Sequence, residues 1–582
     1  QQFNAQTVER LAALIESSLT ELINLCSDPS TCGYTPSDFP LAELDQTQLD
    51  SFAAHHGRGI EALYPLSPMQ AGMAFHTLLD ESGDAAYFEQ LTCRVDGNFD
   101  TERFKQAWQT ALARHSVLRS GLWTAAQPPL QFVPRHVALP WHELDWRDLS
   151  DDEVAAQFDI LLARDRALGF DLSTPPLVRC QLVRIADTAW HFVLSFHHLL
   201  LDGWSLPILF QDLMQVYQRD GVQLAPVAPY QHYIGWLAEQ DSSAAQDYWD
   251  AALAGIDAPT PLPLAQLGSE SSTTDDRAEM TFDFPVDESH AIATYSRHSR
   301  LTLNTLFQGA WALILGRTSG QDGVAFGVTI SGRDIDLPGI EDMVGLFINT
   351  VPLVVSVDEQ PLAQWLQALQ DRHQDNSRFG YMPLADIQRS AQLPANAALF
   401  DSLLVFENYP LEQSLPDQAD AALPIFSGGR AIDHTNYPLT LVAASEGERL
   451  RLRISYQATR LTPVAIERLF ALMRTVLGQV VNASPSASTR SVSLLNETQA
   501  SACIDAGRAE QTILVTDTLV ARFEQQVTDN PERLAVTHDG VSLTYEELDN
   551  KARQVAAQLK AVGVGAGHLV ALIAERGLDL IV

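Results

Sequence analysis

Two adjacent histidines followed closely by an aspartate form the stretch of this sequence best suited to chemistry. His197 and His198 precede a run of leucines, Asp202 and Gly203, in the order HHLLLDG. A neutral imidazole can accept a proton from an amine, or hydrogen-bond to it, near neutral pH, which explains the use of histidine in acyl-transfer sites. The pattern therefore predicts acyl transfer to an amine. Taken alone, it is weak evidence, because a histidine at the end of a strand is more often a structural residue.

The flanking residues predict a strand, a turn and a helix. Residues 190–196 (WHFVLSF) are apolar, aromatic and branched, as in a strand that is buried on both faces. The Asp-Gly pair favours a turn, and apolar residues then recur at helical spacing from Leu206 to Tyr217. Side chains alternate across a strand, so the two histidines must point to opposite sides. One can face a cavity while the other is anchored in the core.

Composition limits the other classes of function. The chain has 582 residues, of which 46% are hydrophobic and 19% charged, enough for several hydrophobic cores. Its net charge of −36 opposes approach to nucleic acid. No apolar run is long enough to span a bilayer, and no signal peptide pattern is present, so we expect a cytoplasmic protein without a membrane partner. The five cysteines lack close C-x-x-C pairs, which predicts reduced thiols and no metal site.

An internal repeat marks the beginning of the chain. Residues 7–25 predict an amphipathic helix with Thr7 as its N-cap. A later helix aligns with it without gaps, matching Val8-Glu9-Arg10-Leu11 to Ile466-Glu467-Arg468-Leu469 and then Leu14, Leu19 and Asn24 to Leu472, Leu477 and Asn482. We interpret the first helix as the tail of a preceding domain of the same kind. The alternative is chance likeness between two amphipathic helices.

Turn-forming segments separate the remaining parts. Residues 34–40 (YTPSDFP) predict a linker before the main domain, and residues 482–488 (NASPSAS) close that domain. Beyond about residue 516, the segment 543–548 (LTYEEL) leads into a helix, and residues 568–573 predict a buried strand.

Five ordered motifs resemble those of condensation domains from nonribosomal peptide synthetases. HHLLLDGWS is similar to the HHxxxDG active-site motif of that family. The flanking motifs are YPLSPMQAGM at 64–73, RHSVLR at 114–119, YQHYIGW at 230–236 and VGLFINT at 344–350. Several matches in order make chance agreement negligible across residues 60 to 490. The last segment resembles the beginning of an adenylation domain.

The resemblance implies an α/β (α+β) fold with two lobes similar to chloramphenicol acetyltransferase. The lobes would form a V-shaped pseudo-dimer with the active site in a tunnel between them. The expected domains are a tail helix and linker at 1–55, the N-lobe at 56–225, the C-lobe at 226–490, a linker at 491–515 and a truncated start of an adenylation domain at 516–582.

The family also implies roles for individual residues. His198 would face the tunnel as the catalytic histidine, with the backbone amide near Gly203 available to an oxyanion. His197 and Asp202 would support the motif. Asp202 would pair with an arginine, for which Arg119 and Arg333 are both candidates, because a buried carboxylate without such a partner is costly. The tunnel residues would be Trp204, Ser205, Met69, Gln70, Asn349 and Tyr437.

The activity implied is amide-bond formation between a donor peptidyl or aminoacyl thioester and the amine of an acceptor aminoacyl thioester. A heterocyclisation domain would carry aspartates in place of the histidine pair. An epimerisation domain shares the histidines, but GWS at 203–205 and FINT at 347–350 favour condensation. A non-catalytic carrier-docking module of the same fold is disfavoured by the intact motif. A stand-alone acyltransferase that uses coenzyme A would need a basic pocket to bind the phosphates of coenzyme A.

The same resemblance predicts the partners. Donor and acceptor peptidyl carrier proteins would each supply 4′-phosphopantetheine, because the chain has no Gly-Gly-x-Ser attachment motif and is expected to bind no cofactor itself. Flanking epimerisation and adenylation domains of the same synthetase are expected neighbours. Residues 33–40 resemble the junction that follows an epimerisation domain, and residues 328–333 and 436–440 resemble the subtype that accepts donors ending in a D-residue.

Overall fold

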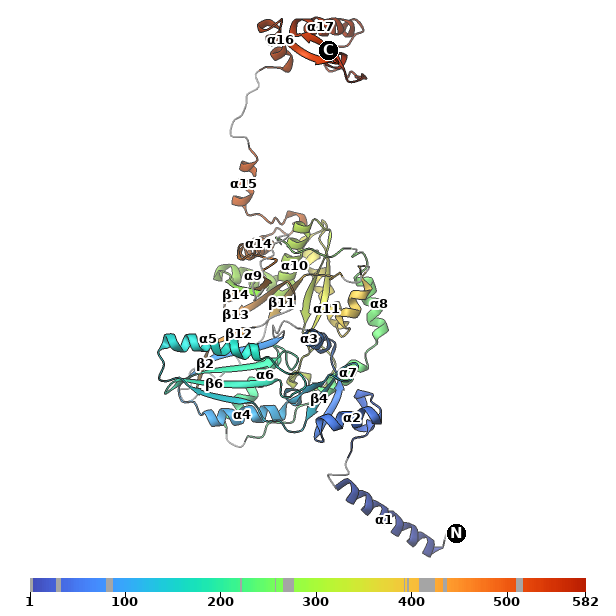
Figure 1. Cartoon of the computed structure of the whole chain (residues 1–582), viewed down its shortest axis with the longest axis vertical. Coiled ribbons are helices and arrows are strands. Elements are labelled where there is room, and N and C mark those ends of the chain that lie inside the picture. The colour runs from blue at the N-terminus through green and yellow to red at the C-terminus, as the bar shows by residue number, and fades with distance from the viewer. Residues whose placement is uncertain are drawn as a thin grey trace. The chain divides into compact units, whose positions relative to one another are not determined.

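A computed structural model describes residues 4–582, except for short segments at 28–32, 80–86, 220–221, 257, 265–276, 392, 395–396, 408–423, 433–436 and 509–516. The chain divides into two compact units, Gln1–Asn496 and Glu497–Val582 (Figure 1). The first unit contains two large hydrophobic cores, each built on its own sheet. The mixed α/β class and the two lobes predicted from the resemblance are therefore confirmed.

The first lobe is built on a five-stranded sheet in the order β12-β2-β7-β6-β5. Its strands are β2 (Phe88–Asp96), β5 (Trp141–Asp145), β6 (Val178–Ala186), β7 (Ala189–His197) and β12 (Ile425–Ile432). A three-stranded sheet adjoins it, in the order β1 (Ile60–Pro65), β4 (Leu130–Pro134) and β3 (Gly121–Trp123). The helices are α3 (Pro68–Leu79), α4 (Thr101–Arg114), η3 (Ser116–Arg119), α5 (Asp151–Leu168), α6 (Ser205–Gln218) and α7 (Gln231–Ala238).

Strand β7 carries the histidine motif to the edge of this lobe's core. It pairs antiparallel with β2 on one side and β6 on the other, so its backbone is satisfied along both edges. Phe192, Leu194 and Phe196 lie in the core together with residues of α4 and α6. Their period of two leaves Ser195 and His197 on the opposite face, as the alternation in the sequence predicts.

The second lobe is built on a six-stranded sheet in the order β10-β9-β11-β13-β14-β8. Its strands are β8 (Arg277–Asp283), β9 (Gly323–Ile330), β10 (Asn349–Ser356), β11 (Ser402–Glu407), β13 (Leu439–Glu446) and β14 (Arg449–Gln457). The helices are α8 (Ser242–Ala252), α9 (Val286–Ser299), α10 (Leu303–Ser319), η4 (Ile340–Asp342), α11 (Leu362–Arg378), α12 (Leu384–Ser390), α14 (Pro463–Val481) and η5 (Thr489–Ser491). The buried helix α10 packs against both α11 and α14.

Two segments of the second half of the chain complete the first lobe. Strand β12 pairs antiparallel with β2, and the 340–347 segment between β9 and β10 contributes Met343 and Phe347 to the first core. Helix α7 also packs there through Tyr233 and Ile234. The lobe boundary predicted between residues 225 and 226 is therefore not a boundary between cores. Apolar periodicity shows that a segment is buried, but it does not show which core the segment joins.

The N-terminal region consists of α1 (Ala5–Ser27), η1 (Pro36–Asp38), η2 (Pro40–Ala42) and α2 (Gln46–His56). Helix α1 begins two residues before the predicted Thr7, because the side chain of Asn4 accepts a hydrogen bond from the Thr7 amide at 2.8 Å. Phe39 and Phe52 pack on the three-stranded sheet in a small core of their own. Residues 36–55, which were predicted to belong to the region of the tail helix and linker, are thus folded against the first lobe.

The second unit contains α15 (Glu497–Ala506), α16 (Leu519–Asp529), β15 (Leu534–His538), β16 (Val541–Thr544), α17 (Tyr545–Ala561) and α18 (Leu578–Ile581). Leu543 and Leu548 are buried, in agreement with the strand and helix predicted there. The strand predicted at 568–573 is wrong for this unit: these residues form no ladder, and Leu569 and Ile573 are almost fully exposed. A strand requires a partner, and the described β15–β16 sheet does not reach it.

None of the helices in the described ranges is both long enough and apolar enough to cross a membrane. Cys93, Cys180 and Cys503 are free thiols. Cys32 and the side chain of Cys26 lie outside the described residues.

Candidate active site

A tight backbone turn follows β7 and places the two histidines. The amide of His198 donates to the carbonyl of Tyr87 at 2.9 Å, which extends the pairing with β2 by one residue. The amide of Leu200 then donates back to the carbonyl of His197 at 3.0 Å and closes the turn. Tyr87 adopts a left-handed conformation, with φ of 63°, immediately before β2. This strained residue supplies the carbonyl that holds His198 in place.

The two histidines face different surroundings and carry their protons on different nitrogens. His197 is 2% exposed, and its Nδ1 accepts a hydrogen bond from the Leu199 amide at 3.2 Å. Its proton must therefore sit on Nε2, which donates to the Thr77 hydroxyl at 3.2 Å. Burial, together with the adjacent His198, lowers the pKa of His197 to about 3, so this ring is neutral.

His198 has the complementary tautomer. It is partly exposed, and its Nδ1 lies 3.0 Å from the carbonyl oxygen of Leu201. A carbonyl can only accept, so Nδ1 carries the proton and donates it. In the neutral ring, Nε2 is then left with an unshared pair that can accept a hydrogen bond or a proton. The turn therefore presents a basic nitrogen at a partly open position.

Asp202 lies at the centre of a hydrogen-bond network that joins the turn after β7 to the connection between β9 and β10. Its side chain is 0% exposed. One carboxylate oxygen accepts from the amide and the hydroxyl of Ser205, at 2.9 and 2.8 Å, and lies 3.3 Å from Arg333 Nη2. The other accepts from the Phe347 amide at 3.0 Å. Both oxygens are satisfied, which a buried carboxylate requires.

Arg333 and Ser205 extend this network along the connection between β9 and β10. Arg333 Nη1 donates to the carbonyls of Ile340 and Met343 at 2.8 and 3.0 Å, and its guanidinium carbon lies 4.2 Å from the Phe347 ring centroid. The Ser205 hydroxyl accepts from Arg333 Nη2 and from the Gly345 amide, both at 3.0 Å. One serine therefore ties the start of α6 to the 340–347 segment.

The sequence left Arg119 and Arg333 as alternative partners of Asp202, and the structure decides between them. Arg333 is the partner. Arg119 lies elsewhere in the first lobe, where its Nη2 donates to Glu61 at 2.6 Å and its other nitrogens donate to backbone carbonyls. The assignment of Arg119 as a support for the histidine motif is wrong, because its donors bind groups of β1, β4 and α4.

Several residues predicted to line a tunnel are buried and form hydrogen bonds within the protein instead. Gln70 is fully buried, and its amide donates to the carbonyl of Leu199 at 2.9 Å. Asn349 is buried and donates to the carbonyls of Gly380 and Met382 at 2.7 and 3.1 Å. Ser205 is also fully buried, and its hydroxyl forms hydrogen bonds with Asp202, Arg333 and Gly345. Their polar groups are already satisfied by the protein, so none is free to contact a substrate without a rearrangement.

The other predicted tunnel residues are more open. Met69, Trp204 and Tyr437 are all partly exposed, as are the predicted catalytic residues His198 and Gly203. The Tyr437 ring stacks on Phe400 at 5.5 Å, and burial raises the pKa of its hydroxyl above the usual range. These residues remain candidates for contact with substrate. Asn436, part of the predicted donor-subtype motif, lies outside the described residues.

Three residues that position the site were not predicted from the sequence. Thr77 holds the His197 ring, and the Tyr230 hydroxyl donates to the carbonyl of Leu346 at 2.6 Å. Gly345 leaves no room for a side chain, since a Cβ there would lie 2.2 Å from the Tyr230 ring. Tyr230 and Gly345 stand in the motifs at 230–236 and 344–350, so their spacing was visible, but their contact was not.

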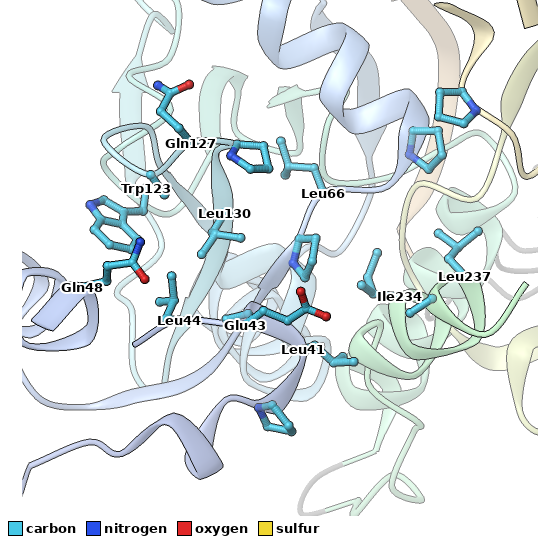
Figure 2. Close-up of a pocket in the computed structure, with 18 of the residues that line it drawn as sticks. Leu41, Glu43, Leu44, Gln48, Leu66, Trp123, Gln127, Leu130, Ile234 and Leu237 are labelled. Atoms are coloured by element: carbon cyan, nitrogen blue, oxygen red, sulfur yellow. The ribbon is translucent and has the colours of Figure 1, made fainter. Parts of the chain in front are cut away.

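A cavity of about 990 Å³ lies away from the histidines. Figure 2 shows Leu41, Leu44, Leu66, Leu130 and Ile234 around it, with Glu43 among them. None of its lining residues belongs to the HHLLLDG motif. Helix α3 connects the two places, because Pro68 at its start lines the cavity and Thr77 near its end contacts His197.

The comparisons with known proteins agree with this geometry. The family model of the condensation domain matches residues 60–503. The chain belongs to this family. A second model, of AMP-binding enzymes, matches residues 523–582, the segment that follows the condensation domain.

The relatives of this condensation domain are large synthetases. It is 39% identical over 594 residues to a linear gramicidin synthase of Brevibacillus parabrevis, in a match that covers 99% of this chain and 7% of the relative. The chain thus spans a small part of the curated relatives that it matches.

Solved structures show the same fold. The nonribosomal peptide synthetase FmoA3 matches 90% of this chain and 54% of its own, with a TM-score of 0.66 and 21% identity. The condensation domain of the Monacolin K polyketide synthase MokA matches 74% of this chain and 100% of its own, with a TM-score of 0.61 and 17% identity.

We expect Arg333→Ala to lower the free energy of unfolding by about 3 kcal/mol. Removing one member of a buried ion pair costs roughly 3–5 kcal/mol, and the hydrogen bonds that Asp202 keeps place this variant at the lower end. Urea unfolding measures the change. The matched control is Arg94→Ala, whose exposed pair with Asp96 should contribute less than about 1 kcal/mol. Equal losses in the two variants would contradict the proposed role of the network.

We expect His197 to make the fold less stable as the pH falls from 6.5 towards 3. The pKa of its ring is about 3 in the folded chain, against the ordinary value of 6.5. In this pH window the ring therefore binds a proton in the unfolded chain but not in the folded chain. Between pH 6.5 and 5 the loss is about 2 kcal/mol. Denaturant unfolding of wild type and His197→Gln at pH 7 and pH 5 tests this. The variant should lose about 2 kcal/mol less than wild type, and parallel losses would refute the assignment.

Proposed function

We propose that this condensation domain forms an amide bond between two substrates that are held as thioesters on carrier proteins. The observation that carries the proposal is the geometry of His198, whose Nδ1 is committed to the Leu201 carbonyl at 3.0 Å. Its partly exposed ring therefore offers Nε2 as an acceptor for an attacking amine. The family and its synthetase relatives support this choice of substrates.

The bond changes balance without a further reactant. The acceptor amine attacks the carbonyl carbon of the donor thioester, and a new C–N bond forms. The C–S bond to the donor pantetheine breaks, and the proton lost by the amine ends on the departing sulfur as a thiol. The product is a peptide or acyl chain that is one residue longer and is attached to the acceptor carrier.

His198 acts mainly by holding the amine in position. A thioester is already an activated acyl group, and an unprotonated amine is a good nucleophile, so alignment of two tethered substrates supplies much of the rate. The amine donates a hydrogen bond to His198 Nε2, which orients the lone pair of the amine towards the carbonyl. The same Nε2 receives the proton as the C–N bond forms. The fixed tautomer means that this nitrogen need not reorganise first.

The turn after His198 provides the second requirement, which is stabilisation of the oxyanion. Gly203 follows the buried Asp202 and is partly exposed, and its backbone amide is our candidate donor to the developing charge. The carboxylate of Asp202 is already satisfied by Ser205, Arg333 and Phe347. Its role in the proposal is to hold the turn, with no proton transfer of its own.

The partners in this proposal are a donor and an acceptor carrier protein, each bearing 4′-phosphopantetheine. The chain itself contributes no attachment serine of the Gly-Gly-x-Ser type. Residues 523–582 match AMP-binding enzymes, which supports an adenylation domain of the same synthetase as the neighbour that selects the acceptor amino acid.

His198→Ala is expected to slow single-turnover condensation by at least about 100-fold, because it removes the group that orients and deprotonates the amine. Both carriers are loaded beforehand, and mass spectrometry follows product on the acceptor carrier. His136→Ala is the control, since this exposed histidine lies outside the turn and its loss should leave the rate unchanged. A wild-type rate in His198→Ala would rule out the role. Inverted donor without elongation would identify an epimerase instead.

We further propose that the donor ends in a D-residue. The segment 328–333 and the segment that contains Tyr437 resemble the subtype that accepts such donors, and Arg333 at the end of the first segment contacts Asp202 directly. The rate with a D-terminated donor thioester is expected to exceed that with its L-isomer by at least tenfold, or about 1.4 kcal/mol in activation free energy. Competition between the two donors on one acceptor carrier measures the ratio. A preference for the L-isomer would reject this subtype.

A further inference from the structure

Helix α1 presents an apolar stripe that the rest of the described chain leaves uncovered. Val8, Leu11, Ile15, Leu19 and Leu22 recur at helical spacing, and each is between 53% and 58% exposed. A stripe of this kind on a helix of 23 residues is the face by which a helix normally packs on a protein core. The proposed condensation reaction makes no use of it.

Helix α14 shows which kind of surface such a stripe fits. The two helices share the same start, because Asn4 caps α1 as Thr462 caps α14, each through its side chain to the amide three residues later. From these caps, the apolar stripe of α1 falls in register on Ile466, Leu469, Met473, Leu477 and Val480 of α14. All of these are buried in the second core, where α14 packs on α9, α10 and β8.

We propose that α1 fills the groove of a second condensation-type domain, in the place that α14 occupies in this one. The shared cap and the shared register support this partner, since residues that are exposed on α1 are those whose equivalents are buried on α14. The proposal concerns an interface and is independent of the chemistry at His198.

Three positions show that the partner is a different domain and not a second copy of this one. Phe470 of α14 stacks on Phe282 at 4.5 Å, and α1 has Ala12 in its place. Val476 is 0% exposed, and its equivalent is Ser18. In the groove of this chain, α1 would therefore leave a cavity and place a polar hydroxyl in the apolar core.

The third difference is a reversal of charge. Arg474 of α14 donates to Glu288 of α9 at 2.9 Å, and the equivalent residue of α1 is Glu16. In this chain's groove, two carboxylates would face each other. The groove that receives α1 must accordingly carry a basic or neutral residue where this chain has Glu288, and larger side chains around the position of Phe282.

A helix exchange within the chain tests the register and the three mismatches. In the first graft, residues 462–482 are replaced by the sequence of residues 4–24. The second graft carries Ala12→Phe, Glu16→Arg and Ser18→Val in addition. We expect the Tm of the first graft to fall by about 10 °C or more, and that of the second to return to within about 5 °C of wild type.

A frame-shifted graft is the matched control. It inserts the sequence of residues 6–26 in place of residues 462–482, so the length is kept. Phe, Arg and Val are placed at positions 470, 474 and 476, which keeps their contacts, while the apolar stripe is turned away from the groove. This graft should melt no higher than the first graft. A second graft that melts no higher than the frame-shifted one would overturn the proposal. A first graft as stable as wild type would overturn the conclusion that the partner differs from this domain.

Discussion

The buried carboxylate of Asp202 is the group on which the geometry of the site depends. A charge with no exposed surface is stable only when nearby donors replace the water that it has lost. Here the donors come from two separate parts of the chain: Ser205 from the helix that follows the motif, Arg333 and Phe347 from the connection between β9 and β10. The turn that presents His198 therefore depends on the connection between β9 and β10, which packs on the first core.

The histidine pair shows how one short turn produces two chemical environments. The alternation of the strand separates the rings, and backbone groups then choose the tautomers: an amide donates to Nδ1 of His197, whereas a carbonyl accepts from Nδ1 of His198. The first ring becomes a neutral structural anchor beside Thr77. The second has a free acceptor nitrogen on its partly exposed side. The same motif thus holds one histidine as a structural anchor and leaves an acceptor nitrogen on the other.

Local sequence predicted much of this arrangement and could not predict the rest. The strand at β7 and the helix at α6 follow from periodicity and turn signals, and the structure confirms them. The two histidines differ in burial and in hydrogen-bond partners. The choice between Arg119 and Arg333 could not be made, because both stand in suitable motifs and only folding brings Arg333 to Asp202. Gln70 and Asn349 were assigned to the tunnel, but their amides are occupied by backbone carbonyls.

The sequence by itself determined the family, the local elements and the pair of matching helices, because these depend on residue types at short, regular spacings. Tertiary structure decided which core each element joins. It placed residues 340–347 and β12 in the first lobe, left the stripe of α1 exposed and buried its counterpart on α14. The physical reason is that apolar burial is non-directional: a stripe of hydrophobic side chains demands a partner surface, but only the three-dimensional fold specifies which surface that is.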